Sequence, residues 1–263
     1  MAVAEILRPL SPQDDARAET VAHIIRQMKR PENGPVLLDE WAEYAGMSKY
    51  ELTAAFRRLT GIPPKTFHNV EKLEIAKRLL VFEDMRVTDV CFEIGFESVG
   101  SFVSKFTKFV GLSPGSYARE MTAASFIKAY LAAILSTAGA MRDRQSQRRL
   151  TFHQPADQTR QNLIAAVFEK PFPSGYPAAW RFVPATRDTA GLGARVAGHC
   201  LVASMPFFPK KTDLINLAPA LIGRAHITRS SQKTEITMAP PTIFDPPITL
   251  AVPAMLSRHG AAA

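Results

Sequence analysis

Basic and hydroxyl-bearing side chains recur in two short segments of this 263-residue chain, residues 48–58 and 98–108. Lysine and arginine pair with anions such as phosphate, and hydroxyl groups both donate and accept hydrogen bonds. The candidates are Ser48, Lys49, Tyr50, Thr53, Arg57 and Arg58 in the first segment, and Ser98, Val99, Gly100, Ser101, Ser104, Lys105 and Lys108 in the second. This chemistry favours binding of an anionic partner, with a solvated helix face as the alternative.

The distribution of charge supports an anionic partner for the middle of the chain. The net charge is +8 and the isoelectric point is near 9.7. Residues 1–97 hold 13 Lys and Arg against 16 Asp and Glu, whereas residues 98–153 hold eight against two. A basic surface therefore lies in mid-chain, which permits a partner such as a nucleic acid without naming it.

The groups that usually carry catalysis are scattered. Cys91 and Cys200 are far apart, and His153, His199 and His226 have no metal-ligand spacing around them. Neither a glycine-rich phosphate loop nor a G-x-S-x-G elbow is present in the sequence. We therefore expect no enzyme, metal site or cofactor, and rank a catalytic C-terminal half third among the hypotheses.

The chain opens without a charged segment followed by an apolar run, and its two cysteines lack disulfide-scaffold spacing. Both features predict a cytoplasmic protein in a reducing compartment. The long apolar stretch 121–141 holds Lys128 near its centre, which disfavours a membrane span.

The two segments fall on predicted helices. Helical spacing of apolar residues indicates helices over 14–28, 38–45, 49–60 and 65–82, followed by two more that begin near Thr88 and Ser98. Ser48 and Ser98 stand where a helix N-cap is expected, and Gly46 and Gly95 where a left-handed turn is expected.

A helix, a glycine turn and a second helix thus occur twice, as residues 38–61 and 87–111. A helix-turn-helix places its second helix in a DNA major groove, and two readers on one face of DNA must lie about 34 Å apart. The predicted helix over residues 65–82 spans about 27 Å, which is the right order of length. Small helical bundles also contain such units, so this pattern alone leaves DNA binding open.

Residues 37–120 resemble the DNA-binding domain of the AraC/XylS family of transcription regulators. The matching stretches are LDEWAEYAGMS from Leu38 and VTDVCFEIGFESVGSFVSKFTKFVGLSP from Val87, with Leu52, Phe56, Gly61, Pro64, Leu73, Ala76, Leu79 and Leu80 between them. The resemblance implies an all-α double helix-turn-helix domain that binds double-stranded DNA sequence-specifically. It also implies that outward positions of the two second helices contact the DNA.

Short side chains at those positions depart from the family pattern. Ala54 and Ser104 stand where relatives often carry longer polar or arginine side chains. Arg57, Arg58, Lys105 and Lys108 suit phosphates, which position a protein without specifying bases. Val99 suits a thymine methyl, and Tyr50 a base edge or sugar. We therefore expect weak direct readout, completed by dimerisation or DNA shape.

Residues 121–154 are predicted to form an amphipathic helical connector with a basic end. Two apolar rows run along residues 126–135, and Arg142, Arg144, Arg148 and Arg149 follow. The helix can pair with a second copy of the chain or pack on its own domains. The basic end suits DNA phosphates or a solvated linker.

From residue 155 onward the pattern becomes extended. Thirteen of the 20 prolines lie here, between candidate strands at 162–168, 178–183, 199–205, 212–217, 224–229, 234–238 and 248–252. We expect an all-β sandwich or barrel over 155–263, beside the helical domain of 14–120.

The β-rich region has no motif that names its role. The family resemblance implies a regulatory or dimerisation domain, with a small-molecule effector and a homodimer as expected partners. The alternative is a ligand-responsive oligomerisation module whose DNA binding is weak or vestigial.

Overall fold

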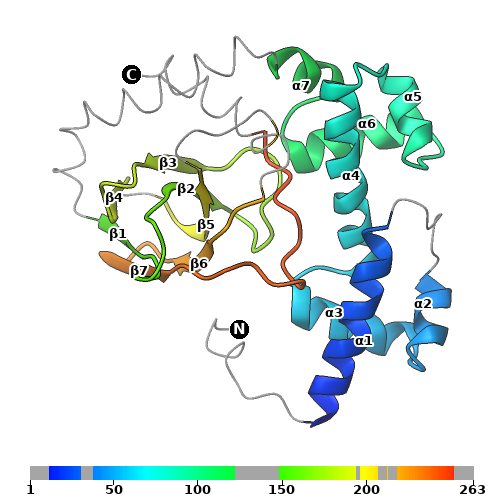
Figure 1. Cartoon of the computed structure of the whole chain (residues 1–263), viewed down its shortest axis with the longest axis horizontal. Coiled ribbons are helices and arrows are strands. Elements are labelled where there is room, and N and C mark those ends of the chain that lie inside the picture. Colours follow the sequence, from blue (N-terminus) through cyan, green and yellow to red (C-terminus); the bar gives the residue numbers. More distant parts are fainter. Residues whose placement is uncertain are drawn as a thin grey trace.

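The computed structural model describes residues 12–30, 38–121, 148–193, 196–206, 212 and 218–251. Helices come first and strands second (Figure 1). The helices are α1 (Pro12–Met28), α2 (Leu38–Tyr44), α3 (Lys49–Thr60), α4 (Pro64–Phe82), α5 (Val87–Glu93), α6 (Val99–Val110) and α7 (Pro114–Glu120). This arrangement confirms a helical N-terminal region and a β-rich C-terminal region.

Two helix pairs lie at opposite ends of α4 (Figure 1). The first pair, α2 and α3, shares a core with α1 built around Ile25, Leu52, Phe56 and Phe67. The second pair, α5 and α6, forms a separate core with α7 around Phe102, Phe106 and Tyr117, among others. We call these the first and second helical units. The helix α4 contributes side chains to both cores and therefore joins them.

The turns inside the two units have the expected backbone. Gly46 has φ of 60° and Gly95 has φ of 71°, the left-handed region that side chains rarely adopt. Each turn is closed by backbone hydrogen bonds, for example from Phe96 N–H to the Cys91 carbonyl at 2.9 Å. The sequence therefore predicted both turns correctly.

The strands form two sheets. They are β1 (Arg148–His153), β2 (Asn162–Phe168), β3 (Ala179–Val183), β4 (Thr189–Leu192), β5 (Gly198–Met205), β6 (Ile222–Ile227) and β7 (Lys233–Thr237). One sheet has the order β4-β1-β7, with β1 parallel to β7, and the other has the order β3-β2-β5-β6. Leu150 and Phe152 of the first sheet share a core with Leu163 and Val202 of the second, so the sheets pack as a sandwich.

Five expected strands are present, as β2, β3, β5, β6 and β7, with ends within two residues of the prediction. The strands β1 and β4 were not expected. Residues 248–251 were predicted as a strand but have no strand partner. The expected strand at 212–217, apart from Thr212, and residues 122–147 of the expected connector lie outside the described residues.

The predicted basic end of the connector is wrong for Arg148. This residue begins β1 and is buried, and its guanidinium donates to the carbonyl oxygens of Ser231 at 2.8 Å and Val196 at 2.7 Å. It also donates to the carbonyls of Gly193 and Thr228. The guanidinium therefore links two loops of the sandwich through hydrogen bonds and is not available to a phosphate.

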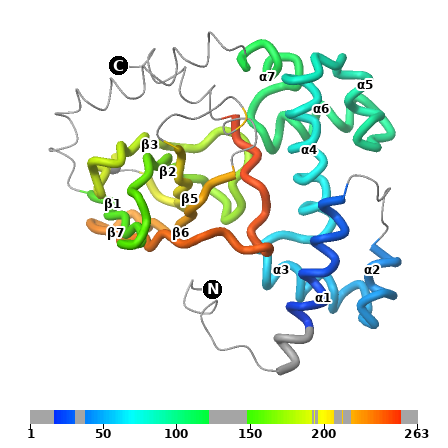
Figure 2. The backbone as a smooth tube through the Cα atoms, in the orientation of Figure 1, coloured from blue at the N-terminus to red at the C-terminus, as the bar shows by residue number. Residues whose placement is uncertain are grey.

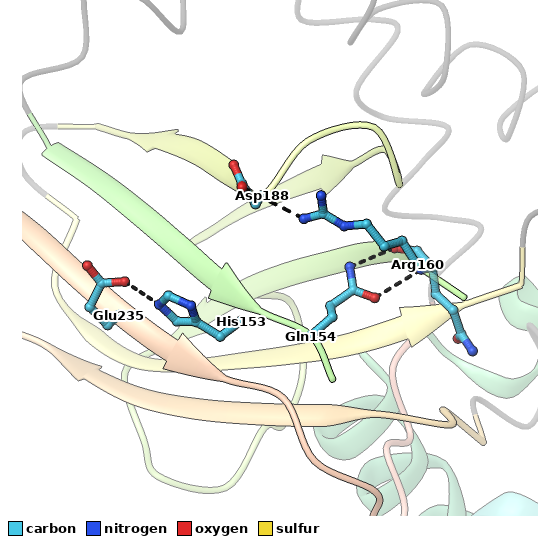
Figure 3. A network of polar contacts seen from close by, with 6 residues as sticks. His153, Gln154, Arg160, Asp188 and Glu235 are labelled. Carbon is cyan, nitrogen blue, oxygen red and sulfur yellow. Dashed lines mark hydrogen bonds and ion pairs between the residues drawn. The ribbon is translucent and has the colours of Figure 1, made fainter. Parts of the chain in front are cut away.

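A polar network closes one end of the sandwich (Figure 3). His153 at the end of β1 pairs with Glu235 of β7 at 2.6 Å, and Arg160 lies 3.8 Å from Asp188. The Gln154 side chain accepts from Gln161 N–H and donates to the Gln161 carbonyl. These contacts hold the loop between β1 and β2. His153, isolated in the sequence, thus forms a surface hydrogen bond with Glu235.

The chain returns to the helices after β7. Residues 239–251, which we call the strap, run between the sandwich and the helical units (Figure 2). The strap leaves the sheet at Ala239, which exchanges two backbone hydrogen bonds with Ile222. The two halves of the molecule are thus in direct contact.

Two titratable groups of α4 are partly buried, and their pKa values shift in opposite directions. Burial, aided by Lys72, lowers the pKa of His68 to about 4, and burial raises the pKa of Glu71 to about 7 despite Lys29 at 3.8 Å. Neither ring nitrogen of His68 has a hydrogen-bond partner among the residues described. A depressed histidine pKa removes stability as pH falls below 6.5, whereas a raised carboxyl pKa adds stability as pH falls through 7.

Between pH 7 and pH 5 these two effects should largely cancel in the wild-type protein. We expect His68→Phe to gain about 1 to 2 kcal/mol in free energy of unfolding over this range, and Glu71→Gln to lose a similar amount. Urea unfolding at both pH values measures the change. The exposed control Glu93→Gln should follow the wild type, and identical pH profiles for all four proteins would contradict the assignment.

Candidate nucleic-acid interface

The helix α3 begins with a reciprocal cap. Glu51 N–H donates to Ser48 Oγ at 3.2 Å, and Ser48 N–H donates to the Glu51 carboxylate at 3.0 Å. The Ser48 hydroxyl also donates to that carboxylate at 2.8 Å. These bonds satisfy N–H groups that a helix start leaves open, and they lower the pKa of Glu51. The cap therefore fixes where the first turn of α3 points.

Beyond the cap, α3 presents a polar outer face. Tyr50 is 88% exposed, and Arg57 and Arg58 are exposed near the end of the helix. Lys49 forms an ion pair with Asp39 of α2, and Thr53 is half-buried. Arg57 and Arg58 are therefore placed at the surface, as a phosphate contact requires. Lys49 has an acidic partner.

The helix α6 begins with a simpler cap, in which Ser101 N–H donates to Ser98 Oγ at 3.3 Å. Phe102 and Phe106 are fully buried and lie edge to face at 5.6 Å, which fixes the inner side of the helix. Gly100, Ser101, Ser104 and Lys108 are exposed on the other side, and Val99 is half-buried. Most of the predicted outer positions of α6 are thus at the surface.

Two lysines converge on the ring of Phe96, the residue after the Gly95 turn. Lys105 Nζ of α6 lies 5.0 Å from the ring centroid, and Lys72 Nζ of α4 lies 5.9 Å from it. Lys72 also donates to the Gly95 carbonyl at 3.4 Å. Burial first, and the charge of Lys105 second, lowers the pKa of Lys72. An anion bound here would relieve that repulsion.

Sequence reasoning missed Lys72. The sequence places Lys72 only within the long helix between the units, because apolar spacing shows which positions point inward. It does not show which distant turn lies beside the polar positions. The sequence of the second helix-turn-helix contains one signal that could have indicated Lys72. Phe96 follows the turn glycine Gly95, so a lysine of α4 that reaches this turn also contacts the second unit.

The structure keeps the predicted residues in two groups. Those of α3 belong to the first unit and those of α6 to the second, with α4 between them (Figure 1). The 19 residues of α4 give a length of about 28 Å. The arrangement suits two separate contacts with one extended anionic partner.

Comparison with known proteins identifies the helical part. Residues 41–120 match a family model described as a helix-turn-helix domain. They form a helix-turn-helix domain of the AraC type, as the sequence resemblance predicted.

An uncharacterized HTH-type transcriptional regulator of Staphylococcus aureus (strain MSSA476) is 34% identical over 80 residues, which are 30% of this chain and 11% of that protein. The HTH-type transcriptional activator AarP of Providencia stuartii is 29% identical over 80 residues, which are 59% of AarP. The match therefore spans about a tenth of the first relative and less than two thirds of the second.

Two solved structures also have some similarity to part of this chain. The DNA-binding domain of AdpA, solved in complex with a target DNA, is 28% identical and covers 39% of this chain and 89% of that one, with a TM-score of 0.34. The C-terminal domain of AraT, a response regulator from Geobacillus stearothermophilus, is 21% identical and covers 43% and 88%, with a TM-score of 0.34.

The residues described show no sign of two other kinds of site. They contain no group of three His, Cys, Asp or Glu side chains that could hold a metal ion. No helix among them has both the length and the apolarity that crossing a membrane requires. Cys200 is buried in the sandwich core, and His199 lies on the opposite face of β5, against His226 with ring centroids 4.7 Å apart.

Replacing Ser48 by alanine should destabilise α3 through loss of the cap. We expect Ser48→Ala to lower the free energy of unfolding by about 1 kcal/mol and Ser48→Asp to retain most of it, because aspartate also caps. Thermal or urea unfolding measures the difference. Ser104→Ala, at an exposed position inside α6, is the matched control and should stay within about 0.5 kcal/mol of wild type. Equal stability of Ser48→Ala and wild type would show that the cap does not stabilise the fold.

Proposed function

We propose that this protein is a sequence-specific DNA-binding transcriptional regulator in which α3 and α6 enter successive major grooves. One observation carries the proposal: two capped helix-turn-helix units stand at the two ends of a helix about 28 Å long, and both expose basic outer faces. Successive major grooves on one face of DNA lie about 34 Å apart. The AraC-type domain and the regulators that resemble it support the same function.

Within this proposal the residues divide by role. Arg57, Arg58, Lys105 and Lys108 contact phosphates, and Lys72 joins Lys105 at a phosphate beside the second unit. The backbone at the starts of α3 and α6, capped by Ser48 and Ser98, approaches the DNA backbone, with Lys49 nearby. Base edges are read by Tyr50 and Thr53 in one groove and by Val99, Gly100, Ser101 and Ser104 in the next.

The sandwich is proposed to modulate DNA binding, through a small-molecule effector or through pairing of two chains. The helical domain is proposed to span 14–120, although α1 begins two residues earlier at Pro12. The sandwich is proposed to start at Arg148, where β1 begins, and not at residue 155. A cavity of about 70 Å³, lined in part by Leu150, Trp180 and Arg181, lies between the sheets. Sites for drug-sized ligands measure about 300 to 1,000 Å³, so this cavity does not name an effector.

The second candidate function is an oligomerisation module with weak DNA binding. The observation that favours it is the first unit, where Lys49 is neutralised by Asp39 and residues 1–97 carry more acidic than basic side chains. Such a module would assemble without a steep dependence on salt.

Selection of bound duplexes from a random DNA pool, using the full-length protein, tests the proposal. We expect a shared motif, bound with an affinity that falls steeply with salt. Each phosphate contact removed makes the slope of log affinity against log salt shallower by about 0.9. Lys105→Ala and Lys72→Ala should each reduce affinity for all sequences, whereas Thr53→Ala and Ser104→Ala should change the preferred bases.

The control is Lys233→Ala, which removes the same charge from β7 in the sandwich and should leave the slope unchanged. Failure to enrich any sequence at low salt, together with salt-independent self-association, would favour the oligomerisation module. Equal slopes for wild type, Lys72→Ala and Lys105→Ala would remove both lysines from the interface.

A further inference from the structure

The last turn of α6 is completed by the sandwich. The final carbonyls of a helix have no partner within it. The Phe109 carbonyl accepts from Gly175 N–H at 3.0 Å and from the Thr249 hydroxyl at 3.1 Å, and the Val110 carbonyl accepts from Ala251 N–H at 3.2 Å. Gly175 lies in the loop between β2 and β3, and Thr249 and Ala251 lie in the strap. The second unit is therefore tied to two separate segments of the sandwich.

Successive side chains at the end of the strap contact the sandwich and the second unit in turn. Ile248 and Leu250 belong to the core on the outer face of the β3-β2-β5-β6 sheet, whereas Ala251 belongs to the core of the second unit and Thr249 bonds to α6. Side chains of an extended segment point alternately to opposite sides. This pattern explains the strand-like sequence of 248–251, whose hydrogen bonds go to a helix end rather than to a sheet.

The same strap also reaches the first unit. Ile243 and Phe244 pack against its core, and the neighbouring Asp245 is held by Arg224 of β6 at 2.5 Å. Asp245 also accepts from Thr242 N–H, which closes a turn. The strap therefore contacts the first unit near 243–244 and the second near 249–251 while anchored to the sandwich between them.

Phe172 contacts both helical units. It packs against both cores, that of the first unit around Phe67 and that of the second around Phe102. Its ring lies edge to face with Phe109, with centroids 6.0 Å apart. It comes from the loop between β2 and β3, three residues before Gly175.

We infer that Phe172 and the strap form a clamp that fixes the relative orientation of the two helical units, so that the sandwich sets the spacing of the DNA segments they read. The inference rests on the proposed DNA binding. Phe172 acts here as a positioning residue, since it lies on the inner side of the units and reaches DNA only through α3 and α6. Loss of its ring frees the units to rock about α4.

Spacing tolerance on DNA tests the clamp. The operator recovered by selection is altered by adding or removing one to three base pairs between its two contacted regions, each of which shifts one region by about 3.4 Å and 35°. We expect a two-base-pair change to cost wild type about 30-fold in affinity, comparable to one mismatched base pair, but Phe172→Ala only about threefold. Phe172→Leu, which keeps apolar volume, should restore most of the discrimination.

The matched control is Val202→Ala, which removes buried apolar volume from the sandwich core without touching the helices. It should lose stability but keep the wild-type dependence on spacing. Equal relaxation in Val202→Ala and Phe172→Ala would show general softening and would overturn the clamp. Unchanged discrimination in Phe172→Ala would overturn it as well.

A second measurement separates the clamp from DNA binding. Spin labels on Glu43→Cys and Glu93→Cys report the distance between the two units in the full-length chain without DNA, because the native Cys91 and Cys200 are buried. We expect a single narrow distance distribution in the wild-type background and a broadened one with Phe172→Ala. A narrow distribution in both refutes the clamp, whereas broadening combined with no selected DNA refutes only the proposed function.

Discussion

The helix α4 must bury side chains against two different cores, and the rest of the helical region depends on this requirement. Phe67 near its start belongs to the first unit, and Val70, Leu73 and Leu80 belong to the second. One continuous helix therefore joins the two units and limits how far apart they can lie. It also carries polar groups into poorly solvated places: Glu74 is held by the fully buried Lys77 at 2.9 Å. Such a pair is costly to break singly, which favours one arrangement of the surrounding helices.

Continuity of α4 limits translation but leaves rotation of each unit about the helix less constrained. Contacts with the sandwich restrict this rotation, because its segments touch both units and the end of α6. The sandwich thus contacts the end of α6 through Gly175, Thr249 and Ala251, and the cores of both units through Phe172.

The helical half could be predicted closely because local signals agree there. Apolar period, capping serines and turn glycines all point to the same helices, and Ser48, Gly46, Ser98 and Gly95 have the roles expected of them. In the sandwich, strands with alternating or continuous apolar residues were also recognisable. The strand β1 was missed because its first residues, two arginines, imitate a basic linker, and only tertiary contacts show that the Arg148 guanidinium is enclosed by carbonyls.

Contacts between distant segments could not be predicted from the sequence either, because they form only when the chain has folded. Lys72 meets Lys105 only after the second unit has folded onto α4, and residues 248–251 resemble a strand because their alternation serves two different partners. The candidate DNA-contact residues were predictable as outward positions of helices. Only the three-dimensional structure shows that these residues form two separate groups and that Lys49 is paired with Asp39.

The seam between the halves includes two glycines in direct backbone contact. A side chain at Gly111 would lie 3.1 Å from the backbone of Gly175, and one at Gly175 would lie 3.2 Å from the Lys108 carbonyl. Both residues also have positive φ. Exchange of the helical domain for that of a relative would therefore need a glycine at each side of the seam. Recombination between such regulators is constrained at this point, although each half looks like an independent module.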